Sequence, residues 1–263
     1  MSEAMRLVTW NVAGRVTRQR EQAEVLAAAG ADVVALQEVT RRTLPLWREA
    51  LAAAGFSATL TTADAPKPEG RRALGVLVAA RRPLVLTPAP AELPWPERVL
   101  CCRIGEIDLV NVHSPIAPAP ELAKVRTHET VADYLAAPAG PARILCGDLN
   151  TPRRELPDGD VLTFARDTKG RLRPERGERW DRAERALVHD LRQNGWVDAF
   201  RSLHGYGERE ASWTFAQDRG GWRLDHVLVR GLRPIAAAYA HEWRRAGLSD
   251  HSALVADLAE TPG

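Results

Sequence analysis

Residues 144–150 read Ile-Leu-Cys-Gly-Asp-Leu-Asn and pass from an apolar run into a polar turn. The first three residues have the composition of a buried strand, and Gly147 lets the backbone turn after them. Alternate side chains of an extended chain share a face, so we expect Asp148 and Asn150 to point into one cleft and Leu149 into the core. A carboxylate beside a carboxamide can orient a water molecule and accept its proton. The stretch therefore predicts hydrolytic chemistry at the end of a buried strand.

The rest of the chain alternates short apolar strands with helices. We expect strands at residues 7–12, 33–36, 56–61, 73–79, 99–104, 107–112, 144–146, 212–215, 223–229, 235–239 and 253–258. We expect helices at residues 19–29, 44–54, 121–135 and near 181–193. Because both hairpins and helices connect the strands, a purely parallel sheet is excluded. The pattern predicts an α+β fold, with two mixed β-sheets packed face to face and helices outside, in a single domain over residues 1–263.

Composition limits the class of protein. A chain of 263 residues can bury a large core without disulfides, and its three cysteines show neither metal-ligand spacing nor a secreted framework. No run approaches the roughly 20 apolar residues that span a bilayer, and no signal-type segment opens the chain. We therefore expect a cytoplasmic protein without membrane association, monomeric and without an obligate protein partner. The net charge of +2 permits binding to polyanions without requiring it.

Polar side chains also stand at other strands of the predicted sheets. Asn11, Glu38 and His113 lie at strand ends, Asp225 interrupts the strand expected at residues 223–229, and the pair Asp250-His251 precedes the last strand. One polar residue at a strand end is usually a turn former. A whole set of acids, amides and imidazoles in such places favours phosphoester hydrolysis.

The oxygen-bearing residues favour a hard cation. The carboxylates of Glu38 and Asp250 and the amide oxygen of Asn11 are ligand types that suit Mg²⁺ or Mn²⁺. Such an ion would neutralise phosphate charge and stabilise the leaving oxygen.

The remaining polar residues have the types needed for acid–base chemistry. Asp148 is the candidate base for the attacking water, positioned by Asn150. His251 stands beside a carboxylate, which favours the imidazolium, and could stabilise the oxyanion with Asp225 as its orienting partner. His113 could bond a non-bridging phosphate oxygen or protonate the leaving group.

Arg71 and Arg72 lie in a glycine-containing loop, close to the place where Glu38 should emerge. Guanidinium groups match the geometry of phosphate oxygens, so this pair is a candidate phosphate clamp. A solvated surface pair is the alternative interpretation.

These stretches resemble the endonuclease/exonuclease/phosphatase superfamily, which includes exonuclease III, apurinic endonucleases and deoxyribonuclease I. The matching segments run in the family's order and are residues 7–12, 36–38, 111–113, 147–150, 222–226 and 249–251. The resemblance implies a four-layer α/β/β/α sandwich, a divalent metal and in-line cleavage of phosphoesters by water. Residues 195–201 and 212–215 are similar to the exonuclease III branch.

His113 departs from the apurinic endonucleases, which usually carry tyrosine there, and is similar to deoxyribonuclease I and to the phosphodiesterase and lipid-phosphatase branches. The function we expect is a divalent-metal-dependent phosphodiesterase, with a DNA nuclease favoured. One alternative is a phosphodiesterase or phosphatase for a small or lipid-linked phosphoester. A more remote alternative is a catalytically silent adaptor of the same fold.

Overall fold

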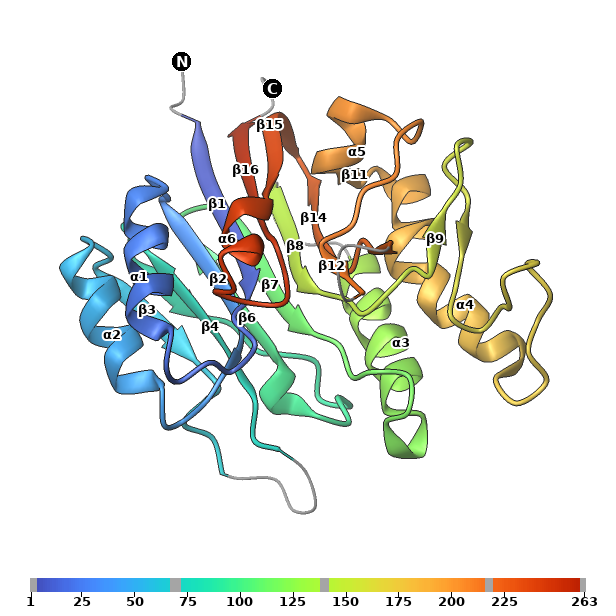
Figure 1. Ribbon diagram of the computed structural model, residues 1–263, viewed down its shortest axis with the longest axis horizontal. Coiled ribbons are helices and arrows are strands. Elements are labelled where there is room, and N and C mark those ends of the chain that lie inside the picture. The colour runs from blue at the N-terminus through green and yellow to red at the C-terminus, as the bar shows by residue number, and fades with distance from the viewer. Residues whose placement is uncertain (1–3, 67–71, 138–141, 216–219, 261–263) are drawn as a thin grey trace.

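Two six-stranded β-sheets pack face to face, and helices cover their outer faces (Figure 1). The computed structural model describes residues 4–66, 72–137, 142–215 and 220–260. The arrangement confirms the predicted four-layer α/β/β/α sandwich of two mixed sheets.

The first sheet has the strand order β15-β16-β1-β2-β4-β3. Its strands are β15 (Leu232–Ala240), β16 (Ala253–Glu260), β1 (Met5–Asn11), β2 (Val33–Val39), β4 (Gly75–Ala80) and β3 (Ala58–Thr61). Strands β1 and β2 are parallel, whereas their other neighbours pair antiparallel. Helices α1 (Gln19–Ala28) and α2 (Leu44–Ala53) pack on its outer face through Leu26 and Trp47, beside α6 (His241–Arg245).

The second sheet has the order β11-β14-β8-β7-β6-β5. Its strands are β11 (Val197–Asp198), β14 (Asp225–Arg230), β8 (Ala142–Asp148), β7 (Ile107–His113), β6 (Val99–Ile104) and β5 (Leu84–Leu86). Helices α3 (Ala123–Ala136) and α4 (Gly177–Val188) pack on its outer face through Leu135 and Leu187. The remaining helical segments are α5 (Ala199–His204), η1 (Pro96–Arg98), η2 (Pro120–Leu122) and η3 (Asp190–Asn194). Among the residues described, no helix is both long enough and apolar enough to cross a membrane.

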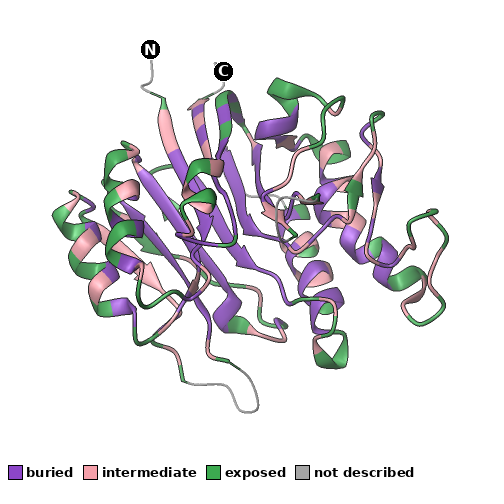
Figure 2. Cartoon of the chain, viewed as in Figure 1, coloured by how far each residue is buried: buried purple, intermediate pink, exposed green. Residues whose placement is uncertain are grey.

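Successive side chains of the central strands pack on opposite faces of their sheet. Ile144 of β8 packs in the core between the sheets, whereas Leu145 packs against the helices. Leu7 and Val8 of β1 divide in the same way. Figure 2 shows the central strands of both sheets buried and the outward faces of the helices exposed. Because both faces of each sheet are covered, these strands are almost continuously apolar in sequence.

Several element boundaries differ from the sequence expectations. The helix expected near residues 181–193 begins at Gly177 and ends at Val188, because the backbone leaves the helical conformation at His189 (φ −126°, ψ −55°) and η3 follows. The strand expected at residues 223–229 begins at Asp225, which opens β14 and does not interrupt it. The residues before it form β13 (Gly221–Trp222), paired with β12 (Trp213–Thr214) in a separate ribbon. A second ribbon of β9 (Arg154–Glu155) and β10 (Val161–Leu162) was not expected.

Candidate active site

Strands of both sheets end at one edge of the sandwich and bring polar side chains together there. His113 and Asp148 are neighbours in the parallel strands β7 and β8, and Asp225 faces Asp148 because β14 runs antiparallel to β8. In the other sheet Asn11 ends β1, and Glu38 follows in the adjacent strand β2. The Asn11 Nδ2 atom donates to Asp148 Oδ2 at 3.0 Å and so joins the two sheets. The topology therefore gathers residues that are distant in sequence.

Gly147 permits the close approach of β7 and β8 at this edge. Its φ is +123°, and a Cβ atom at this position would lie 2.0 Å from the Val112 carbonyl oxygen. Only glycine fits such a backbone. The glycine of the 147–150 stretch thus sets the position of Asp148 beside the neighbouring strand.

The Asp148 carboxylate is buried and held from two sides. Its Oδ1 accepts from the Asn150 backbone N–H at 2.9 Å, and its Oδ2 accepts from Asn11. Burial raises its pKa to about 7, against the opposing charge of His251 and with added repulsion from Asp225. A carboxylate that titrates near neutral pH is suited to accept a proton from water.

Asp225 and His251 form a buried ion pair. Asp225 Oδ2 lies 2.8 Å from His251 Nδ1, and His251 Nε2 points to Asp148 Oδ2 at 3.9 Å. Burial alone would lower the pKa of His251, but the charges of Asp225 and Asp148 raise it to about 10. The imidazole is therefore a cation at neutral pH. The Trp10 indole N–H fixes this segment by donating to the His251 carbonyl at 2.9 Å.

Glu38 occupies a β-bulge. The pairing of β2 with β4 shifts between Gln37 and Val39, and Glu38 has the left-handed φ of +61°. A bulge re-aims a side chain, and strained backbone of this kind is concentrated at functional sites. The Glu38 Oε1 atom lies 3.5 Å from Asn11 Nδ2 and 3.6 Å from His113 Nε2.

His113 is buried between this carboxylate and a guanidinium group. Its Nδ1 lies 2.6 Å from Arg98 Nη1, and its Nε2 lies 3.9 Å from Asp148 Oδ2. Burial, followed by the positive charge of Arg98, holds the pKa of His113 well below its usual value. Its imidazole is therefore neutral at neutral pH, in contrast to His251.

Other expected site residues lie at the rim or are turned elsewhere. Asp250 is exposed and accepts from the Trp213 indole at 3.4 Å, and no hydrogen bond within the described residues links it to Asn11 or Glu38. The Asn150 side chain donates to the Ser114 carbonyl at 2.8 Å, so its main contact with Asp148 is through its backbone. Arg72 is 60% exposed, with its Nη1 4.0 Å from Glu38 Oε2. Arg71 lies outside the described residues.

The oxygen donors of the site fit a hard cation. Ligand atoms of Asp148, Asp225 and His251 lie within 4.8 Å of one another, but a protonated His251 has no free lone pair, so the carboxylate oxygens remain as donors. The buried Oδ1 atom of Asp225 has no hydrogen-bond partner among the described residues. Carboxylate and amide oxygens are the ligand types that suit Mg²⁺ or Mn²⁺.

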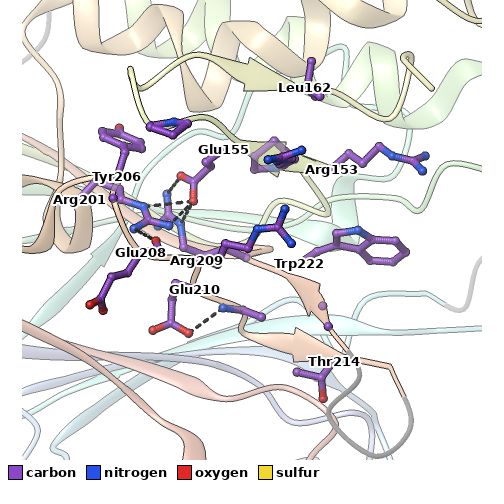
Figure 3. A pocket seen from close by; sticks show the side chains of 18 of the residues that line it. Arg153, Glu155, Leu162, Arg201, Tyr206, Glu208, Arg209, Glu210, Thr214 and Trp222 are labelled. Carbon is purple, nitrogen blue, oxygen red and sulfur yellow. Dashed lines mark hydrogen bonds and ion pairs between the residues drawn. The ribbon is translucent and has the colours of Figure 1, made fainter. Parts of the chain in front are cut away.

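A hollow of about 720 Å³ lies beside the strand ends (Figure 3). Its lining includes Pro152, two residues after Asn150, and Arg223, two residues before Asp225. Arg153, Arg209 and Trp222 line it. Its walls thus combine guanidinium groups with an aromatic ring.

Two buried residues near the site were missed by sequence reasoning. Lys124 donates to the Asn150 carbonyl at 2.6 Å, and His128 bonds the Leu149 carbonyl at 3.1 Å. Both occur at the helical spacing of the buried residues Val131 and Leu135. A lysine and a histidine on the apolar face of a helix are the signal that could have identified them.

Comparison with known proteins agrees with this geometry. Residues 8–251 match the model of the Endonuclease/Exonuclease/phosphatase family. No curated protein matches the chain.

Solved structures share the fold at low sequence identity. An AP endonuclease from Archaeoglobus fulgidus has a TM-score of 0.72 at 22% identity, over 96% of this chain and 98% of its own. The 3'-5' exonuclease NExo from Neisseria meningitidis has a TM-score of 0.67 at 20% identity, over 97% of this chain and 100% of its own. D. rerio TDP2, complexed with a single-strand DNA product, has a TM-score of 0.67 at 16% identity, over 97% and 98% of the two chains. Together with the match of the family model over most of its length, these findings show that the chain belongs to the endonuclease/exonuclease/phosphatase family.

Proposed function

We propose that this chain is a divalent-metal-dependent phosphodiesterase that acts on DNA, working as a monomeric single domain. The observation that carries the proposal is the surroundings of Asp148. Its carboxylate accepts from Asn11 and from the Asn150 backbone, and its Oδ2 lies 3.9 Å from the Nε2 atoms of both His113 and His251. A water molecule and a phosphate group that enter this space meet a base and two imidazoles at once.

Asp148 acts as the base in this proposal. The rise of its pKa to about 7 by burial matches its proton affinity to work at neutral pH. Asn11 and Asn150 keep its two oxygens oriented, so that the attacking water is held in one direction.

The two imidazoles take different roles because their charges differ. His251, kept cationic by Asp225, stabilises the negative charge that develops on the phosphorane oxygens. His113 is neutral and donates a hydrogen bond to a non-bridging oxygen. A protonated imidazole has no free lone pair for a metal, so we assign His251 to charge stabilisation and not to metal binding.

Glu38, Asn11 and Asp250 are the residues that we propose for holding Mg²⁺ or Mn²⁺. When bound, the ion would neutralise phosphate charge and stabilise the leaving oxygen. Glu38 and Asn11 already lie together, while the exposed carboxylate of Asp250 would complete the set from the rim. Arg72, beside Glu38, is placed to contact an incoming phosphate.

The choice of DNA rests on the hollow beside the site. Stacking of bases on aromatic rings and pairing of phosphates with guanidinium groups are the usual means of binding single strands. Arg153, Arg209 and Trp222 line this hollow and supply both kinds of contact. The structural relatives named above include proteins described as nucleases and one described with a DNA product.

A substrate panel tests the proposal. The purified chain with Mg²⁺ is given abasic, nicked and blunt duplexes, single-stranded DNA, RNA, inositol phosphates and sphingomyelin. We expect cleavage of DNA that EDTA abolishes and added Mg²⁺ or Mn²⁺ restores. Cleavage confined to the last two substrates would support the small or lipid-linked phosphoester instead, and no cleavage of any substrate would support the silent adaptor.

A further inference from the structure

A fully buried ion pair lies behind the turn that follows β8. The Lys124 ammonium on α3 donates to Glu184 Oε1 on α4 at 2.6 Å, and the two side chains are 1% and 0% exposed. Removing two charges from water costs free energy that an apolar pair of similar volume would not. The packing of α3 against α4 therefore does not by itself account for the pair.

Both partners also bond the turn. Lys124 Nζ donates to the Asn150 carbonyl at 2.6 Å, and Glu184 Oε2 accepts from the Thr151 hydroxyl at 2.9 Å. Asn150 has the left-handed φ of +51°, a conformation that is uncommon for non-glycine residues and that asparagine adopts more readily than most. Its backbone N–H is the group that binds Asp148 Oδ1.

Both carboxylate oxygens of Glu184 accept hydrogen bonds within this network. Its Oε1 accepts from the Trp180 indole at 2.7 Å as well as from Lys124, and its Oε2 also accepts from the Phe164 backbone N–H at 2.7 Å. His128, one helical turn after Lys124, donates from Nε2 to the Leu149 carbonyl. Side chains from two neighbouring turns of α3 thus donate hydrogen bonds to the Leu149 and Asn150 carbonyls, which follow Asp148.

We infer that Lys124 and Glu184 are positioning residues that fix the Asn150 turn and, through its backbone N–H, the direction of the Asp148 carboxylate. They act through the turn, since their contacts are with Asn150, Thr151, Phe164 and the helices. The catalytic part of this inference rests on the proposed phosphodiesterase function, whereas the structural part does not. An apolar pair could join the helices equally well, but it could not bond the Asn150 carbonyl.

The test uses the double variant K124M/E184Q. It removes both charges together and keeps a side-chain oxygen for Thr151 and the Phe164 N–H. The matched control is R179M/E129Q, which removes an exposed ion pair that joins the same two helices, with Arg179 Nη2 2.8 Å from Glu129 Oε2 and no contact with the turn. The measurements are the hydrogen exchange of the Asn150 amide, and kcat and KM for an aryl phosphodiester with Mg²⁺.

We expect the Asn150 amide to exchange about tenfold faster in K124M/E184Q, as loss of a charged hydrogen bond implies. We expect kcat to fall about 10²-fold with KM unchanged, as misplacement of a reacting group implies. The control should match the wild type in both measurements.

Each other outcome has a separate meaning. Unchanged exchange at Asn150 in the double variant would overturn the positioning role, whatever the activity. Faster exchange with wild-type kcat would overturn its catalytic consequence. A wild-type chain that cleaves no phosphoester would overturn the proposed function, while the exchange measurement still decides the positioning. If the double variant does not fold, T151V removes only the bond to Glu184, and wild-type exchange at Asn150 in T151V would overturn the inference.

Discussion

Asp225 and His251 are joined by a buried contact of 2.8 Å between Oδ2 and Nδ1, and the second nitrogen of the imidazole faces Asp148. Asp225 begins β14 of the second sheet, whereas His251 lies in the segment that leads into β16 of the first sheet. This contact keeps the His251 imidazole protonated in the folded protein at pH values where the unfolded chain has lost that proton. It therefore links folding stability to pH.

The pH dependence of stability in EDTA should reveal this proton. The folded protein holds it up to the His251 pKa of about 10, whereas the unfolded chain releases it near 6.5. The contribution is complete below 6.5 and is lost as pH rises toward 10, at up to about 1.4 kcal/mol per pH unit. Denaturant unfolding between pH 7 and about 8, where most thiols of the unfolded chain still hold their protons, measures it. An equally steep decline in H251N would contradict this origin.

The substitution D148N should abolish most activity and leave the fold intact. Asparagine keeps an oxygen for the Asn150 N–H but cannot accept a proton. We expect kcat to fall about 10²–10⁴-fold, the usual worth of a general base, with little change in KM. Steady-state cleavage with Mg²⁺ is the measurement, and D133N on the exposed side of α3 is the control. Activity of D148N close to that of D133N would exclude Asp148 as the base.

The substitution G147A should destabilise the protein strongly. The Cβ atom of an alanine at position 147 would lie 2.0 Å from the Val112 carbonyl oxygen. The backbone there has a φ of +123°, which only glycine adopts readily. Overpacking and the positive φ together predict a loss of about 2–4 kcal/mol in the free energy of unfolding. G207A is the control, because its Cβ would meet no atom within 4 Å, and it should stay within about 0.5 kcal/mol. A tolerated G147A would mean that β7 and β8 can separate at no cost.

The sequence predicted the layers because the fold buries both faces of each sheet. Apolar runs such as residues 33–36 and 144–146 could only be central strands, and they are. The strand expected at residues 212–215 contains β12, but its partner β13 and the ribbon β9–β10 were not expected, because two paired residues leave no periodicity to detect. The end of α4 was misplaced because Leu191 continues the helical spacing of Leu187 and Val188, although the α-helix ends at Val188 and Leu191 lies in η3.

Sequence patterns likewise predicted part of the candidate site and missed the rest. Residue types at strand ends predicted that Asn11, Glu38, His113, Asp148 and Asp225 would face one another, and the structure brings them together. Sequence could not show that one imidazole is neutral and the other cationic, because that depends on Arg98 and Asp225 approaching from distant segments. Nor could it show that Asp250 is turned toward Trp213.

DNA binding should depend less steeply on salt concentration when Arg153 and Arg209 of the hollow are replaced by alanine. Arg153 and Arg209 line it, and within the described ranges neither takes part in an ion pair, so both guanidinium groups can meet phosphates. Each lost phosphate contact lowers the slope of log K against log salt by roughly 0.7 on a single strand. The double variant R153A/R209A should therefore lose about 1.4 in slope, as measured by fluorescence anisotropy between 50 and about 200 mM salt with D148N as background. R20A, an exposed arginine on α1, should change the slope little. A slope in the double variant equal to that of R20A would show that the strand passes elsewhere, because counterion release counts only the phosphates that are in contact.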